Sequence, residues 1–304
     1  MINYLTCPYC FGKSRLIIKN DQFTCSRCRH RFIYRNHILK FINPEELDNK
    51  TAKELKGNTF ALNEKNIKHF ANKDNWSKYY NFFVNQKINY LLFFLDQINY
   101  KGVVSLGSGP GFEIKEILKR RRLSLIFSSD LALSATKVVP YTLKNYNGRL
   151  CLFTSDLRYP PFIPNANFPI IIYEALHHTG NIHKTINTLL AKGYKDIIIV
   201  EPCTNFIIKI LAKLGMAQKE EYSGMIPDFL DIKKLKEIAS HRKYKLQIKT
   251  MWDIPENYIR LFSKEDGILE KIFMKLIYTF SLITNYFSIG SFAIVYFKKS
   301  DFKQ

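Results

Sequence analysis

The sequence predicts an α/β protein with a seven-stranded, mostly parallel, doubly wound sheet and a small N-terminal zinc ribbon. Short apolar runs alternate with segments long enough for helices from residue 101 onward, which is typical of βαβ units covered on both faces. Two Cys-x-x-Cys pairs stand within the first 30 residues. The 304 residues, 46% of them hydrophobic, are enough for one large domain and one small module.

The predicted zinc ligands are the thiolates of two knuckles, Cys7 with Cys10 and Cys25 with Cys28, separated by 14 residues. Two such knuckles can hold four sulfur atoms tetrahedrally around one Zn²⁺, and the gap leaves room for a two-stranded hairpin. A disulfide pair, a redox Cys-x-x-Cys motif and replacement of Cys28 by His30 are the alternatives. The start of the sequence has no signal-peptide pattern, so we expect a cytoplasmic protein and reduced thiols.

The organisation is expected in three parts. Residues 1–42 form the ribbon, and residues 43–99 form a polar linker followed by an aromatic, helical cap over 75–99. Residues 100–304 form the main domain. Apolar residues at helical spacing predict a helical insertion at about 255–288.

A glycine-rich turn follows the first predicted strand of the main domain, in VVSLGSGPGF, and precedes a helix. A dinucleotide fingerprint needs a third glycine where Phe112 stands, and a phosphate-binding P-loop needs a Lys-Ser or Lys-Thr pair that is missing from the turn. The remaining pattern is G-x-G-x-G, made by Gly107, Gly109 and Gly111.

With its context, this turn resembles class I S-adenosylmethionine (SAM) methyltransferases of the broad small-molecule branch, over roughly residues 100–298. The resemblance implies that the turn wraps the methionine end of SAM. It also implies that Asp130, at the tip of the second strand, binds the ribose hydroxyls and that Asp156, after the third strand, binds the adenine amine. The implied cofactor-binding residues are Ser105, Gly107, Ser108, Gly109, Gly111, Asp130, Leu131, Asp156, Leu157 and Tyr173.

The sequence departs from the family at Ser105, where the family usually has an acidic residue. We expect this change to weaken an anchor for the ammonium group of the cofactor, with Ser105 or a water serving instead.

Candidate catalytic residues follow the fourth strand in the stretch FPIIIYEALHHT. His178, His177 and Glu174 stand at the carboxyl edge, where ligands bind in such sheets, and each can accept a proton. A base is required only if the acceptor must lose a proton. The alternative is that a histidine merely bonds a loop carbonyl.

The acceptor is predicted less sharply than the cofactor. The Leu-His-His edge favours a small molecule or a lipid- or glycan-linked intermediate, methylated at oxygen or nitrogen. The ribbon resembles the small zinc proteins that partner or fuse with methyltransferases acting on varied targets, and it also resembles that of a bacterial ribosomal-RNA methyltransferase family. A net charge of +20 and the aromatic segment at 76–90 are compatible with gripping RNA, so a ribosomal or transfer RNA base is the second candidate. A non-catalytic adaptor with the same fold, recruiting a partner through the ribbon, is the third.

Two amphipathic segments, 205–216 and 259–283, carry apolar faces with lysines beside them. They are expected to pack on the sheet or over the pocket, or to touch an anionic membrane peripherally on its inner face. No apolar run is long enough to predict a transmembrane span.

Overall fold

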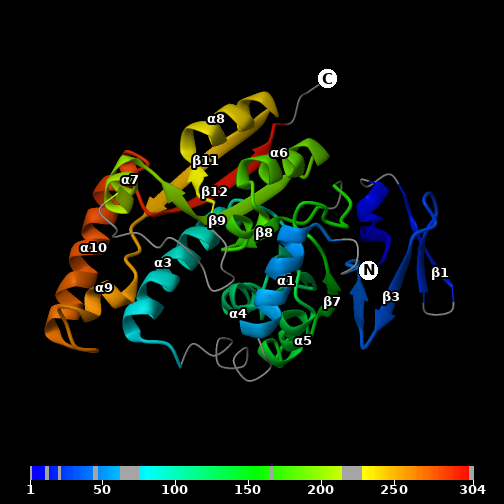
Figure 1. Cartoon of the computed structure of the whole chain (residues 1–304), viewed down its shortest axis with the longest axis horizontal. Helices are drawn as coiled ribbons and strands as arrows, with labels where there is room; N and C mark the ends of the chain where they lie inside the picture. The colour runs from blue at the N-terminus through cyan, green and yellow to red at the C-terminus, as the bar shows by residue number, and fades with distance from the viewer. Residues whose placement is uncertain are drawn as a thin grey trace.

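The computed structural model describes residues 2–10, 14–19, 22–43, 47–61, 75–164, 167–213 and 228–300. A single continuous sheet runs through the described part in the order β1-β2-β3-β4-β7-β6-β5-β8-β9-β12-β11, and β10 pairs with β9 (Figure 1). The strands are β1 Leu16–Lys19, β2 Gln22–Cys25, β3 Arg31–Arg35, β4 Ile38–Lys40, β5 Gly102–Leu106, β6 Leu125–Asp130, β7 Arg149–Thr154, β8 Ile170–Tyr173, β9 Asp196–Thr204, β10 Leu230–Asp231, β11 Tyr244–Met251 and β12 Phe292–Lys299.

The seven strands from β7 to β11 form the predicted doubly wound core. Strands β7, β6, β5, β8 and β9 are parallel, and β12 is antiparallel to both β9 and β11. The described helices are α1 Asn49–Ala61, α3 Lys78–Leu95, α4 Phe112–Leu118, α5 Leu133–Thr142, α6 Ile182–Lys192, α7 Phe206–Lys213, α8 Ile232–His241, α9 Glu256–Arg260 and α10 Ile268–Tyr286, with short 3-10 turns η1 Ile2–Tyr4, η2 Pro8–Cys10 and η5 Leu176–Thr179. The fold class predicted from the sequence is confirmed.

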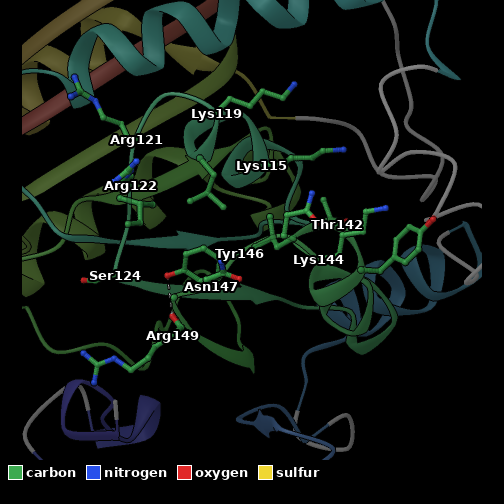
Figure 2. A pocket seen from close by; sticks show the side chains of 16 residues that line it. Lys115, Lys119, Arg121, Arg122, Ser124, Thr142, Lys144, Tyr146, Asn147 and Arg149 are labelled. Carbon is green, nitrogen blue, oxygen red and sulfur yellow. Dashed lines mark hydrogen bonds between the residues drawn. The ribbon is translucent and has the colours of Figure 1, made fainter.

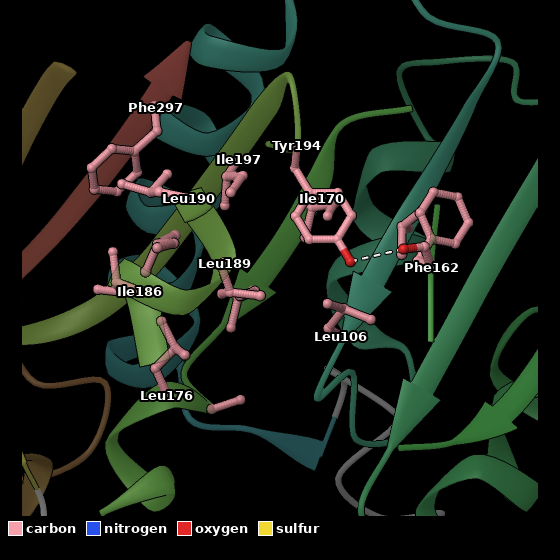
Figure 3. Close-up of a cluster of buried hydrophobic side chains, with 14 of the residues drawn as sticks. Leu106, Phe162, Ile170, Leu176, Ile186, Leu189, Leu190, Tyr194, Ile197 and Phe297 are labelled. Atoms are coloured by element: carbon pink, nitrogen blue, oxygen red, sulfur yellow. Dashed lines mark hydrogen bonds between the residues drawn. The ribbon is translucent and has the colours of Figure 1, made fainter. Parts of the chain in front are cut away.

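Both faces of the core sheet are buried, as the uninterrupted apolar strands predict. Along β8, Ile170 and Ile172 enter one apolar cluster and Ile171 enters the other, because successive side chains of a strand point to opposite faces. Helix α6 covers the first face with Ile186 and Leu190 (Figure 3). Helices α3, α4, α5 and α10 contribute to the cluster on the second face.

The ribbon extends the sheet of the main domain, which the sequence did not predict. Strand β4 pairs in parallel with β7, with Leu39 opposite Phe153. The Phe41 amide donates to the Thr154 carbonyl at 3.2 Å, and the Phe41 and Phe153 rings lie 5.9 Å apart, edge to face. The ribbon is therefore bonded to the sheet through both backbone and core contacts.

The predicted linker contains helix α1. Asp48 caps it, since its carboxylate accepts from the Thr51 amide at 3.0 Å and from the Thr51 hydroxyl at 2.9 Å. The polar composition of 43–58 concealed this helix. Residues 44–46 and 62–74 of the linker, and residues 214–216 of the predicted amphipathic segment, lie outside the described residues.

The aromatic cap is the helix α3, which begins after the N-cap Ser77, whose hydroxyl accepts from the Tyr80 amide at 3.1 Å. Tyr79 and Phe83 are each 1% exposed and pack under the helix. These two rings of the segment 76–90 pack in the core and are not exposed to stack RNA bases, whereas Tyr80 is 42% exposed.

Candidate functional site

The glycine turn between β5 and α4 has the geometry of a ligand cradle. Gly107, Gly109 and Gly111 have φ values of 67°, 50° and 79°, a region that side chains strongly disfavour. A Cβ atom on Gly107 would lie 2.5 Å from the Cβ of Ala175, whereas nothing stands within 4 Å of one on Gly109. The turn is thus packed behind Gly107 and open in front of Gly109, where bare backbone can approach a ligand.

Asp130 lies at the tip of β6, beside this open space. Its Oδ2 accepts from the Gly109 amide at 2.9 Å and its Oδ1 accepts from the Ala132 amide at 2.8 Å. Each carboxylate oxygen can accept two hydrogen bonds, so one acceptor position per oxygen remains for a vicinal diol. Burial raises the pKa of Asp130, while the two amides lower it.

Ser105 is fully buried at the end of β5, and its hydroxyl donates to Glu113 Oε1 at 2.5 Å. Glu113, on the first turn of α4, is 3% exposed. Burial raises its pKa to about 7, against the hydrogen bond from Ser105, which lowers it. A carboxyl group therefore lies directly behind the turn even though the strand itself carries a serine.

Asp156 and its neighbour Arg158 join the loop after β7 to α1. Arg158 Nε lies 3.0 and 2.9 Å from the two oxygens of Asp156, and the same guanidinium reaches Asp48 at 2.7 Å and the Thr51 hydroxyl at 2.6 Å. The Asp156 carboxylate thus already accepts several hydrogen bonds within the loop. Its predicted contact with adenine stays a prediction.

The predicted catalytic residues lie together after β8. Glu174 has a positive φ of 49°, and His177 and His178 follow in η5, with ring centroids 4.1 Å apart. His178 Nδ1 lies 3.1 Å from Oε1 of Glu54, a residue of α1 that is 2% exposed. In Figure 1, α1 lies across this edge of the sheet, and the contact with His178 and the Arg158 contacts tie it there.

Glu201 on β9 organises this turn. One oxygen of its fully buried carboxylate accepts from the Ala175 amide at 2.6 Å and from the Leu176 amide at 2.5 Å, and the other lies 2.5 Å from Nδ1 of His177. An ionised carboxylate is an acceptor only, so Glu201 in that form holds the His177 proton on Nδ1. Its Nε2 is then the ring nitrogen able to accept a proton.

Glu174 is fixed by a buried cation. Lys87 on α3 is 1% exposed, and its Nζ lies 3.0 Å from Glu174 Oε1, 2.7 Å from Asp253 Oδ2 and 3.5 Å from the centroid of the Phe292 ring. Burial alone would lower the pKa of Lys87, but the two carboxylates outweigh it and raise that pKa. The Lys87 ammonium group therefore bridges Glu174, which follows β8, and Asp253, which follows β11.

The four ribbon cysteines form a cluster with metal-site geometry. Their Sγ atoms all lie within 4.8 Å of one another, and the Cys7–Cys28 and Cys10–Cys25 pairs are 3.7 Å apart. Zn–S bonds of about 2.3 Å in a tetrahedron place the sulfurs about 3.8 Å apart, so the donor set fits Zn²⁺. His30 instead stacks its ring against Tyr9 at 4.4 Å.

Sequence reasoning missed four charged residues of this region: Lys87, Glu113, Glu201 and Glu54. The first three had a usable signal, since each is a charge within or beside an apolar run that becomes a buried element. Glu54 had none, because it stands in a polar segment whose helix was not foreseen.

A cavity of about 1210 Å³ lies at the opposite, amino edge of the parallel strands (Figure 2). Its lining includes Ser124, which precedes β6, and Arg149, which begins β7. Arg121 is paired with Asp96, and Lys119 with Glu116 at 2.7 Å. The charged residues of the lining are all basic, namely Lys115, Lys119, Arg121, Arg122, Lys144 and Arg149.

Strand order, glycine turn and acidic strand tip together define the fold of SAM-dependent methyltransferases. No protein-family model matches the sequence, and no curated protein matches it. Among solved structures, phosphoethanolamine N-methyltransferase 2 of Haemonchus contortus with bound SAM is 12% identical, with a TM-score of 0.51. The match covers 84% of this chain and 61% of that one.

Magnesium protoporphyrin IX methyltransferase from Synechocystis PCC 6803 with bound SAH is 11% identical over 71% of this chain and 82% of that one, with a TM-score of 0.45. At such identities the likeness concerns the fold. Within the described residues, no helix is both long and apolar enough to cross a membrane.

Proposed function

We propose that this protein is a SAM-dependent methyltransferase that transfers a methyl group to oxygen or nitrogen of a small-molecule or lipid- or glycan-linked acceptor. One observation carries the proposal. The turn opens in front of Gly109, and within the described part of the chain each oxygen of Asp130 accepts one hydrogen bond, from Gly109 or Ala132, which leaves a second acceptor position on each. A ligand with a diol next to a group that needs close backbone contact fits this arrangement.

The proposed cofactor contacts are those implied by the resemblance: the turn residues with Ser108, then Asp130 and Leu131, Asp156 and Leu157, and Tyr173. Tyr173, at the end of β8, has its ring 6.4 Å from that of Phe112. When bound, SAM supplies a methyl carbon already activated by the sulfonium. The residues around it need only align the acceptor and exclude water.

His177 is the proposed base for acceptors that must lose a proton. Glu201 holds its Nδ1, so Nε2 takes the proton, and the same carboxylate stabilises the imidazolium that results. Glu174 and His178 are proposed to orient the acceptor from the same edge. We further propose that Zn²⁺ in the ribbon is structural, since β4 ties the ribbon to the sheet beside β7.

A second candidate, methylation of a ribosomal or transfer RNA base, is favoured by the cationic cavity. Lys115, Arg122, Lys144 and Arg149 line it together, and exposed Tyr141 lies among them. Against this candidate, the cavity lies at the amino edge of the sheet, away from the glycine turn.

The test is transfer of a labelled methyl group from SAM by purified protein to separated small-molecule, lipid and RNA fractions of a cytoplasmic and membrane extract. Labelled lipid or small-molecule fractions support the first proposal, and labelled RNA selects the second. Binding of SAM without transfer to any fraction would support the adaptor and contradict both. His177→Ala, with Glu201 intact, serves as the inactive control.

A further inference from the structure

Helix α10 is held against the molecule by polar side chains as well as by the buried Ile277. Ser281 Oγ accepts from the Trp252 amide at 2.9 Å, and Thr284 Oγ1 accepts from the Trp252 indole Nε1 at 3.0 Å. Asn285 Oδ1 accepts from the Thr250 amide at 2.7 Å. Ser281 and Thr284 are buried, whereas the polar residues of a surface helix usually face solvent.

The outward side of α10 is apolar. The residues of this side recur every three or four positions and so share one face of the helix. Their exposed fractions lie between 47% and 65%, and over the 19-residue helix they form a stripe of about 27 Å. This α10 stripe consists of Leu269, Ile272, Leu276, Phe280, Ile283 and Phe287.

Neighbouring elements enlarge the stripe. Leu261 and Phe262, which follow α9, are 73% and 67% exposed, and Phe206 and Ile210 on α7 are 62% and 53% exposed. Asn205 Nδ2 donates to the Gly290 carbonyl at 2.5 Å, which holds the start of α7 against the end of α10. Figure 1 shows α7, α9 and α10 on one side of the molecule. The α10 stripe and these four residues form the apolar face discussed below.

The charge around the apolar face is mostly positive. Lys271 and Lys275 on α10 and Lys209 on α7 are exposed. Glu270, the single acidic residue of α10, is 1% exposed and ion-paired with Arg260 at 2.5 Å. The loop before α10 adds Lys264, Glu265 and Asp266, and Asp266 is paired with Lys78 at 2.8 Å.

We propose that the apolar face docks on an anionic bilayer surface. A surface helix with apolar residues directed outward and lysines beside them matches the acyl boundary and the headgroups of such a bilayer. A second copy of the chain would oppose the same lysines and repel. The chain carries +20, so its overall charge also favours an anionic surface over a copy of itself.

The face also adjoins the site, which deepens the proposed function and rests on it. The Cys203 amide donates to the Ser291 carbonyl at 2.8 Å, so the end of α10 lies at the carboxyl edge of β9. The same edge carries the His177 turn through Glu201. Docking by this face places the site beside the membrane, where a lipid-linked acceptor is presented.

Co-sedimentation of the full chain with vesicles tests the proposal. Vesicles of phosphatidylcholine with one part in three of phosphatidylglycerol should bind the protein, and pure phosphatidylcholine should bind it less. Leu276→Glu and Phe280→Glu should each weaken binding by about tenfold or more, since each removes a side chain that enters the acyl region. The matched control is Ile33→Glu on β3, because Ile33 and Leu276 are both 61% exposed and lie near opposite ends of the sheet.

Vesicle binding that is absent, or unchanged in Leu276→Glu, would overturn the proposal. Light scattering on the same samples tests whether a second copy of the chain covers the face instead. A dimer that Leu276→Glu dissociates would assign the face to that second copy. SAM affinity, measured in parallel, should be the same in all three variants. Vesicle binding without SAM binding would leave the docking surface standing and remove the methyltransferase.

Discussion

Replacing Lys87 with methionine tests how the acceptor edge is held. The substitution keeps the length of the side chain and removes the charge that bridges Glu174 and Asp253. Both carboxylates are then left facing each other with little solvent, since the side chain of Asp253 is 16% exposed and that of Glu174 is 28% exposed.

Breaking a buried ion pair by removing one partner costs about 3–5 kcal/mol, and partial exposure of Glu174 favours the lower end. The loss should grow from pH 5 to pH 8. Burial raises the pKa of Asp253, and removing the lysine removes the charge that lowers it, so stability of the variant falls as pH rises.

Urea unfolding at both pH values measures the effect. Lys78→Met is the matched control on the same helix. Lys78 is also paired, with Asp266 at 2.8 Å, but its side chain is 73% exposed, so we expect little or no loss of stability. Adding Glu174→Gln and Asp253→Asn to Lys87→Met should recover most of the loss. The reasoning is refuted if Lys87→Met costs no more than Lys78→Met.

Three further predictions concern single groups. The pKa of the Glu113 carboxyl is raised from 4.5 to about 7, so the protein becomes less stable as pH rises through that window. Glu113→Gln should remove about 3 kcal/mol of this pH dependence, measured by urea unfolding at several pH values. A pH dependence equal to that of the wild type would contradict the buried charge. Cys25→Ser should lower the zinc content measured by mass spectrometry to well below one per chain; stoichiometric zinc would mean another ligand set. Glu201→Gln should lower kcat by about tenfold or more and change its pH profile while SAM affinity holds; an unaltered profile would remove His177 as the base.

The core of the fold could be predicted because its signals are local. The runs VVSL, PIIIY and DIIIV carry apolar residues at consecutive positions, which favours strands covered on both faces. The pairing of β4 with β7 could not be predicted, since it joins residues more than a hundred positions apart without a local pattern. Helix α1 was missed because its cap, Asp48, stands in a segment that otherwise looks like a linker.

Part of the candidate site could likewise be predicted from the sequence, and part could not. The turn glycines and Asp130 follow from spacing along one βαβ unit. The charged supports of Glu174 and His177 come from elsewhere in the sequence: Lys87 from α3 and Glu201 from β9. These contacts depend on how helices lie across the sheet, and sequence spacing does not record that.

Calorimetric titration of the purified protein with SAM tests the methyltransferase assignment most directly. We expect saturable binding to one site, weakened about tenfold or more in Asp130→Ala because both ribose acceptors are lost. Zinc content and the unfolding transition should be retained in that variant. Absence of SAM binding, or equal affinity in Asp130→Ala, would contradict the proposed cofactor site.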